Sequence, residues 1–465
     1  MPDAELLQSA ALNLLTRSLR LREHKNLLIV ADPAALDLAE LVMRQAQARA
    51  IHATCIYVPR SQQAAHRQGD DLPTPLHEAI RVADGVLSCL ADGPAFLFFR
   101  GAVLQTSLTP FTRTLHAPGL TLATLDAAAV DYDLVHRWCS NLALPLVMGR
   151  RLEIVSTDHL GATHRLVVTL PGWESPPAIS DGVVDEGRWA NLPPGETFIL
   201  PTDGDGAIAI NGSLPGMVLA GADSTVLHFE HGRLVEWTPT GGVATRHLFA
   251  TQLDPARLDG DPNWSRLAEI GFGVNPLIGN LLGVEAYDEK KAGTIHIALG
   301  SNSELGGNIT ASIHCDLVVE RPTVTVDGRL LLENGEMRLQ VADWLLDVYQ
   351  QGMDADELMA WWETVTAVHR TMARAEINDG ELYRTWAIKS GRHGRLPVGT
   401  PRSARLAARL YALLPENAAL IDCEELTTRA AEAGIPVRLT PACVRLLLTY
   451  DLVRVKGGVK YERES

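Results

Sequence analysis

Two histidines and three carboxylates in the middle of this sequence are the residues best suited to chemistry. They lie in four short segments between residues 190 and 320. Imidazole and carboxylate groups together are good ligands for zinc, cobalt, manganese or iron. With three carboxylates, one could bridge a pair of ions. We therefore predict a site for one or two divalent metal ions, with the members Glu196, Glu269, His296, His314 and Asp316.

The segment SIHCDLVV contains two of these residues with one position between them. Side chains alternate along a β-strand, so His314 and Asp316 should point to one side and Cys315 to the other. We therefore expect the histidine and the aspartate to bind the same ion, and we exclude the cysteine as a ligand. A hydrogen-bonded His–Asp pair without a metal is the alternative explanation of this spacing.

The other three residues also have plainer explanations. Glu269 in LAEIGFGVNP has apolar neighbours, and a buried carboxylate must be paired, protonated or bound to a cation. His296 in GTIHIALG alternates with isoleucines, as a core histidine bonded to a backbone carbonyl also would. Glu196 in NLPPGETFILP follows a glycine at an expected strand edge, where glutamate is usually solvated. Only the combination of all five residues favours a metal site.

The first third of the chain has the pattern of an α/β domain, which we place at residues 1–145. Short apolar runs alternate with helical stretches, and this spacing predicts a parallel sheet with helices on its faces. No GxGxxG motif follows the first run, so a dinucleotide is not inferred. The expected strands are residues 26–31, 52–58 and 85–90, and the expected helices are residues 34–50 and 76–82.

The composition changes near residue 150, where glycine, proline and β-branched residues become frequent. We expect residues 146–340 to form a β-rich, barrel-like domain of antiparallel strands that carries the metal site. Its clearest strand candidates are residues 164–170, 207–210, 217–219 and 323–326.

The remaining sequence predicts a helical connector at residues 341–400 and a winged-helix-like domain at residues 401–465. Helical stretches there precede LVRVKGGVKYER, which has the pattern of a hairpin with a Gly-Gly turn. Nearly all of the net charge of −15 lies before residue 351, so the winged-helix-like segment is close to neutral. Nucleic acid is therefore an unlikely partner, and we expect contact with a protein partner, with a second copy of the chain, or with the body of this chain alone.

The overall composition is that of a globular protein of several domains, with 465 residues and 46% hydrophobic residues. No apolar run approaches the roughly 20 residues of a membrane span, and the N-terminus lacks the features of a signal peptide. Six scattered cysteines without a CxxC pair argue against a disulfide framework. We expect a cytoplasmic protein without membrane contact.

The four segments together resemble those of metalloaminopeptidases of the aminopeptidase T type. NLPPGETFILP, LAEIGFGVNP, GTIHIALG and SIHCDLVV occur in the family's order, and TVTVDGRLLLENGEM resembles its final hairpin. The resemblance implies a hydrolase that removes N-terminal residues from peptides, acts as a homodimer and binds metal through the five residues named above. It also implies a proton-transfer role for Glu196 or Glu269.

Two further functions fit the same segments. The family's tyrosine after the third segment is replaced here by SNSELGG, which leaves open a non-catalytic peptide-binding scaffold. Iron-dependent dihydroxypyridine ring-cleaving dioxygenases also look similar, with two histidines and one aspartate as the iron ligands. In those dioxygenases the resemblance implies a histidine at the position that Glu269 occupies in this chain. A dioxygenase is therefore the second function that we consider, after the aminopeptidase.

Overall fold

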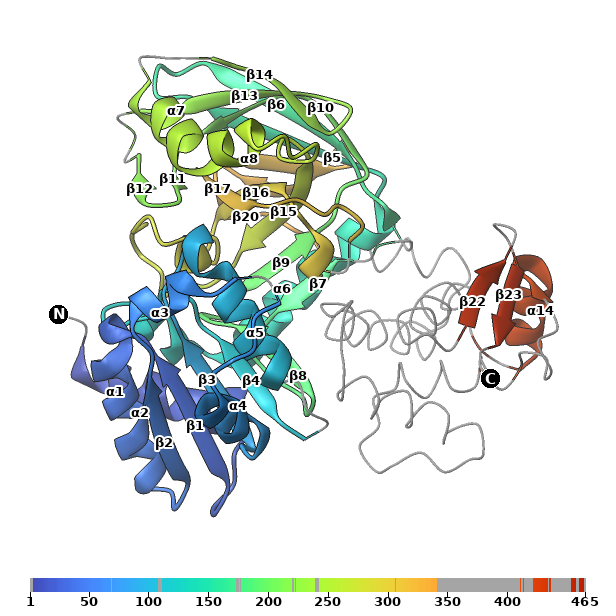
Figure 1. The fold of residues 1–465 in the computed structure, drawn as a ribbon. Helices are drawn as coiled ribbons and strands as arrows, with labels where there is room; N and C mark the ends of the chain where they lie inside the picture. Colours follow the sequence, from blue (N-terminus) through green and yellow to red (C-terminus); the bar gives the residue numbers. More distant parts are fainter. Residues whose placement is uncertain are drawn as a thin grey trace.

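The computed structural model describes most of residues 3–340 and parts of residues 410–463 (Figure 1). Within the first range the description omits residues 68, 108–110, 173, 174, 176, 220, 222, 239–241 and 306. The connector predicted at residues 341–400 lies outside the described residues. Among the helices that the structure describes, none is long and apolar enough to cross a lipid bilayer.

The N-terminal sheet is parallel, as the alternation of strands and helices predicts. Its strand order is β2-β1-β3-β4-β8. Along β1, Leu27 and Ile29 face one hydrophobic core while Leu28 and Val30 face another, because helices cover both faces of the sheet. The strands are β1 (Asn26–Ala31), β2 (His52–Tyr57), β3 (Gly85–Cys89), β4 (Arg113–His116) and β8 (Arg188–Asn191).

The helices of this part of the chain follow the expected pattern. The stretches predicted at residues 34–50 and 76–82 form α2 and α4 with slightly different ends. The helices are α1 (Ala4–Asn13), α2 (Leu36–Gln47), α3 (Arg60–Ala65), α4 (Thr74–Arg81), α5 (Leu97–Ser107) and α6 (Tyr132–Met148).

The β-rich region folds as two antiparallel sheets rather than as one. The larger sheet has eight strands in the order β14-β13-β10-β6-β5-β18-β19-β20. Neighbouring strands in this sheet pair antiparallel. Its strands are β5 (Arg151–Thr157), β6 (Thr163–Thr169), β10 (Asp203–Ile210), β13 (Thr225–Glu230), β14 (Arg233–Thr238), β18 (Thr323–Val326), β19 (Arg329–Glu333) and β20 (Glu336–Met337).

The second sheet has seven strands in the order β12-β11-β17-β16-β15-β9-β7, and it carries the predicted site. One face packs against the larger sheet in a common core, to which Ile270, Ile297 and Leu317 contribute. The strands are β7 (Ala178–Ser180), β9 (Glu196–Ile199), β11 (Ser213–Leu214), β12 (Met217–Val218), β15 (Leu267–Gly273), β16 (Thr294–Gly300) and β17 (His314–Glu320). Short helices α7 (Val243–Leu248) and α8 (Asp254–Leu258) lie between β14 of the larger sheet and β15, and α9 (Glu285–Asp288) lies between β15 and β16.

The described C-terminal residues include the two strands of the predicted hairpin. β22 (Val453–Lys456) pairs antiparallel with β23 (Lys460–Arg463), and β21 (Ile421–Asp422) pairs with the other edge of β23. One helix, α14 (Cys423–Glu432), follows β21. The turn at residues 457–459 and most of the expected helices lie outside the described residues, so the winged helix stays a prediction.

Candidate metal centre

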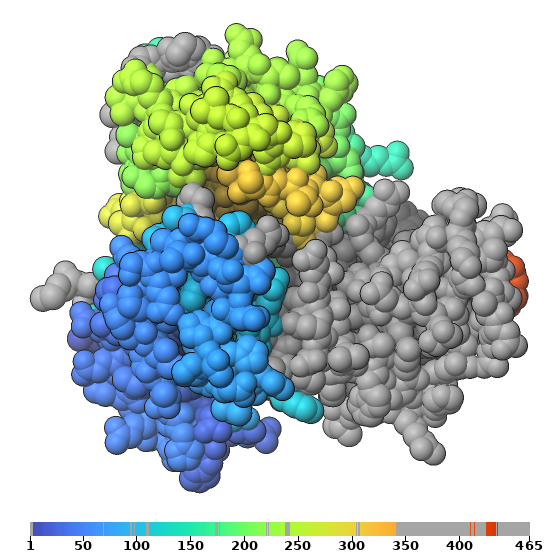
Figure 2. All heavy atoms as spheres, viewed as in Figure 1, coloured from blue at the N-terminus to red at the C-terminus, as the bar shows by residue number. Residues whose placement is uncertain are grey.

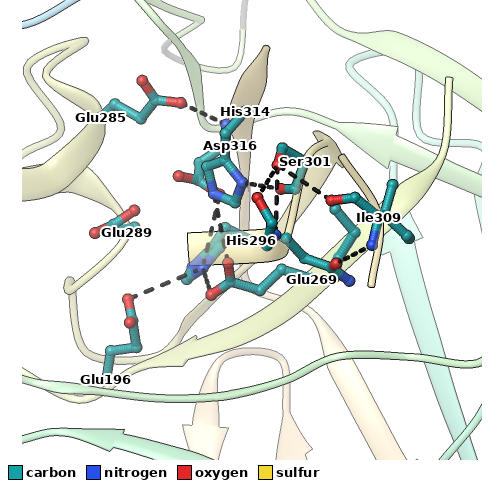
Figure 3. A network of polar contacts seen from close by, with 12 residues as sticks. Glu196, Glu269, Glu285, Glu289, His296, Ser301, Ile309, His314 and Asp316 are labelled. Atoms are coloured by element: carbon teal, nitrogen blue, oxygen red, sulfur yellow. Dashed lines mark hydrogen bonds and ion pairs between the residues drawn. The ribbon is translucent and has the colours of Figure 1, made fainter. Parts of the chain in front are cut away.

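The five residues predicted from the sequence come together on four neighbouring strands of the seven-stranded sheet (Figure 3). β9 begins with Glu196, β15 carries Glu269, β16 carries His296, and β17 supplies His314 and Asp316. All five therefore occupy one face of the sheet, opposite the face that packs into the core.

Alternation along the strands separates the site from the core. On β17, Cys315 is fully buried in the hydrophobic core between the two site residues, as the sequence predicts. On β16, Ile295 and Ile297 face the core, while His296 faces the site. The exclusion of Cys315 as a ligand is consistent with this geometry.

A β-bulge places Glu269 on the site face. The pairing between β15 and β16 shifts register between Leu267 and Glu269. The extra residue lets Leu267 and Ile270 both face the core while Glu269 faces the site. Across the sheet, Ala298 lies between Glu269 on one neighbouring strand and Asp316 on the other. Its small side chain leaves room for the two carboxylates.

Three overlapping triads of potential ligand atoms result. They are Glu196–Glu269–His296, Glu269–His314–Asp316 and Glu289–His296–Asp316, each with its ligand atoms within 4.8 Å of one another. Glu269 belongs to two of them, because its Oε1 lies 3.4 Å from His296 Nε2 and its Oε2 lies 3.5 Å from His314 Nε2. Glu269 therefore occupies the position of a carboxylate shared between two ion sites.

Three acidic or basic residues of the site were not found from the sequence. Glu285 opens α9 and accepts a hydrogen bond from the backbone N–H of Asp316 at 2.5 Å. Glu289 completes the third triad, and Lys290 donates to both Glu196 and Glu289. In the sequence these residues lie in EAYDEKK, a charged run that ordinarily indicates a solvated surface.

A glycine lets this acidic segment approach the sheet. A Cβ on Gly273 would lie 2.1 Å from the carbonyl oxygen of Lys291 and 2.8 Å from that of Glu289. Any other residue at 273 would therefore push the chain that carries Glu289 and Lys290 away from β15.

His314 is held in the orientation that a metal ligand needs. His314 Nδ1 lies 2.6 Å from the carbonyl oxygen of Ser301, which can only accept, so Nδ1 carries the proton. The other ring nitrogen, Nε2, is directed at Glu269 and Asp316. Such a hydrogen bond to a backbone carbonyl is the usual support of a metal-binding histidine.

Burial and mutual contact shift the pKa values of several groups in the cluster. Burial raises the pKa of Glu269, and it raises the pKa values of Glu285 and Glu289 well above their usual range. Burial also acts on Asp316, but the facing histidines outweigh it and lower its pKa. Burial alone would lower the pKa of His296, yet its carboxylate neighbours raise it to about 10. Without a cation, the carboxylates therefore keep protons on the histidines.

The residues present fit a divalent cation. Asp316 Oδ1 is buried without a hydrogen-bond partner and lies 3.4 Å from His314 Nε2. A buried carboxylate oxygen without a hydrogen bond is costly, and a bound cation would satisfy it. Nitrogen and oxygen donors of this kind suit zinc, manganese, cobalt or iron.

The site lies on the wall of a cavity of about 1100 Å³. The β-rich wall contains the carboxylates and His314, whose side chain is 33% exposed. The opposite wall comes from the α/β region and includes His116 and Arg100, which is bound to Asp92 at 2.6 Å. Figure 2 shows the two parts meeting along a recessed seam. A substrate could therefore reach the metal ligands from solvent.

A second acidic cluster in the described part of the chain is exposed. Asp203, Asp205 and His231 also lie within 4.8 Å of one another, but they are on the surface of the eight-stranded sheet. Nothing buries them or directs them into the cavity, so the site on the seven-stranded sheet is the stronger candidate.

The sequence matches no protein-family model and no curated protein. Solved structures do match the fold. One is 2,5-dihydroxypyridine dioxygenase from Pseudomonas putida KT2440, with 18% identity, a TM-score of 0.54 and coverage of 72% of this chain and 97% of that chain. Another is wild-type AmpT, aminopeptidase T, from Thermus thermophilus, with 18% identity, a TM-score of 0.50 and coverage of 72% of this chain and 99% of that chain.

Both structural neighbours share the fold of this chain over 72% of its length. The resemblance inferred from the four segments is thus supported at the level of the fold. At this identity the comparison does not distinguish the two activities, and the choice between them rests on the chemistry of the site.

Proposed function

We propose that this chain is a metal-dependent hydrolase that removes N-terminal residues from peptides. The observation that carries the proposal is the composition of the triads. Each of the three triads that line this site combines one histidine with two carboxylates. Hard oxygen donors in that proportion suit zinc, cobalt or manganese in hydrolysis, whereas non-haem iron oxygenases use two histidines and one carboxylate.

A bound divalent ion would polarise the scissile carbonyl group and lower the pKa of a coordinated water. Glu269, His314 and Asp316 would hold it at the cavity wall, and Ser301 would keep His314 in the required tautomer. The sequence assigned proton transfer to Glu196 or Glu269. We favour Glu269, because its Oε1 faces His296 and would stay off an ion held beside Oε2. Burial also raises its pKa, and a general base works best with a pKa near the working pH.

The acidic lining supports exopeptidase rather than endopeptidase action. Glu285 borders the cavity beside Asp316. The ammonium group of a free peptide N-terminus would favour the charged form of Glu285 and pair with it, which would place the first peptide bond at the metal ligands. The acylated N-terminus of a blocked peptide carries no such charge.

The test uses the metal-loaded protein and a pair of peptides that differ only in N-acetylation. We expect release of the first residue from the free peptide and none from the acetylated one. Equal cleavage of both would exclude an aminopeptidase.

The ring-cleaving dioxygenase is the second candidate, because the dioxygenase structure has the higher of the two TM-scores. Its test is oxygen consumption by the iron-loaded protein with 2,5-dihydroxypyridine. We expect none, and oxygen uptake with one iron per chain would reverse the ranking.

A further inference from the structure

Lys290 is a buried cation at the edge of the candidate metal centre. Its side chain is 0% exposed, and its Nζ donates to Glu196 Oε2 and Glu289 Oε1. Lysine is almost never fully buried unless its charge is paired, and here two carboxylates pair it. The position of this ammonium group therefore bears on where a metal ion can bind.

Lys290 engages two of the three triads and not the third. Glu196 belongs to the triad with Glu269 and His296, and Glu289 belongs to the triad with His296 and Asp316. The remaining triad, Glu269–His314–Asp316, has neither of these two carboxylates. It also contains the partly exposed His314, so it is the triad open to the cavity.

The backbone holds Lys290 in this place. The carbonyl oxygen of Lys290 accepts a hydrogen bond from the backbone N–H of Asn275 at 2.8 Å. The backbone N–H of Lys290 donates to the carbonyl oxygen of Tyr287 at 3.2 Å. Close approach at Gly273 fixes the same segment against β15. The backbone of Lys290 is therefore fixed beside the two carboxylates that its ammonium group binds.

We propose that Lys290 takes the place of a second divalent ion, so that the chain binds a single ion at Glu269, His314 and Asp316. A divalent ion bound to Glu196 would approach the ammonium group that already occupies this carboxylate, and like charges repel strongly where water is excluded. The inference rests on the metal site of the proposed function but not on peptidase activity. It replaces the sequence-based expectation of one or two ions with one.

In this arrangement Glu196 is a partner of Lys290 rather than a metal ligand. Glu269 keeps one oxygen for the ion and one for His296. The shared carboxylate of Glu269 would allow two ion positions. In this proposal a metal ion occupies one of them, and the ammonium group of Lys290 takes the place of the second ion.

The experiment counts ions without substrate. The chain is stripped with a chelator, saturated with Mn²⁺ and desalted, and bound manganese is measured by elemental analysis and electron paramagnetic resonance. We expect one ion per chain with the spectrum of an isolated Mn²⁺. Two ions per chain with a spin-coupled spectrum would overturn the proposal.

Lys290→Met removes the charge and keeps an unbranched side chain of similar length. We expect the variant to bind a second ion. Lys291→Met is the matched control, because Lys291 pairs with Glu320 away from the triads and should leave the count at one. A folded Lys290→Met protein that still binds one ion would show that the lysine does not exclude the second.

Lys290→Met leaves two buried carboxylates unpaired and can fail to fold, so glutamine variants give an independent readout. Glu196→Gln should keep one ion with the affinity of the wild type, and Glu269→Gln should lose it. Loss of the ion in Glu196→Gln would make Glu196 a ligand and contradict the proposal. A wild-type protein that binds one ion but cleaves no peptide would contradict the proposed function and leave the role of Lys290 intact.

Discussion

Gly271 lies directly opposite His296 in the pairing of β15 with β16, and a Cβ at position 271 would lie 2.1 Å from Cε1 of the imidazole ring. The imidazole ring of His296 on β16 can lie over β15 because Gly271 has no side chain.

Gly271→Ala should therefore displace His296 and destabilise the protein by about 1–3 kcal/mol, the usual range for overpacking. Metal affinity should fall as well if His296 contributes to the centre. Thermal melts and metal titrations measure the two effects. Gly279→Ala is the control, because a Cβ there meets nothing within 4 Å. A Gly271→Ala protein with unchanged stability would contradict the described packing.

His314→Ala and Asp316→Ala should each lower metal affinity by roughly tenfold or more, because each removes a ligand from the triad open to the cavity. Elemental analysis after dialysis against a known free metal concentration measures the loss. Asp205→Asn in the exposed cluster should leave the bound metal unchanged. Equal losses in all three variants would mean that the site is not the one described.

Cys315→Ala should leave metal binding intact although Cys315 lies between two proposed ligands. The thiol faces the core, burial raises its pKa well above the usual value, and it should not react with thiol reagents in the folded chain. We expect a loss of about 1 kcal/mol in stability from the missing core atoms. A weaker metal site in this variant would show that the alternation along β17 is wrong.

Metal affinity should rise with pH up to about pH 10. In the metal-free chain the carboxylates raise the pKa of His296 to about 10, and an ion bound to Glu269 and Asp316 would offset their charge and release this proton. Calorimetry in buffers of different ionisation enthalpy measures the protons released on metal binding. Metal binding without proton release would contradict the coupling of His296 to its carboxylate neighbours.

The same pKa gives the metal-free chain a pH-dependent stability. A histidine whose folded pKa lies above its unfolded value stabilises fully below about pH 6.5 and loses this contribution as the pH rises to about 10. Thermal melts of the metal-free protein should therefore show a falling midpoint over this range. The metal-loaded protein should be less affected, because its imidazole carries no extra proton.

Local patterns were enough to predict much of the fold and five members of the site. The strand β1 has the bounds expected from its apolar run, since a strand in a doubly covered parallel sheet is apolar on both faces. Alternation on β17 likewise placed His314 and Asp316 together and Cys315 apart, because the period of two is a property of every strand.

The missed features depend on contacts between distant segments. The sequence around Lys290 indicates a surface residue, but its ammonium group is paired with Glu196, 94 positions earlier in the chain, as well as with its neighbour Glu289. The strand β8 lies within the region whose composition indicates the β-rich domain, yet it pairs with β4 of the N-terminal sheet. Neither contact has a local signature, because each is decided by how complete elements pack.

The metal centre is the claim on which the account depends, and anomalous scattering from crystals of the Mn²⁺- or Zn²⁺-loaded protein tests it most directly. The account predicts one strong peak bounded by Glu269, His314 and Asp316, with Lys290 still between Glu196 and Glu289. A peak at Asp203, Asp205 and His231 instead, or none on the seven-stranded sheet at saturating metal, would contradict it.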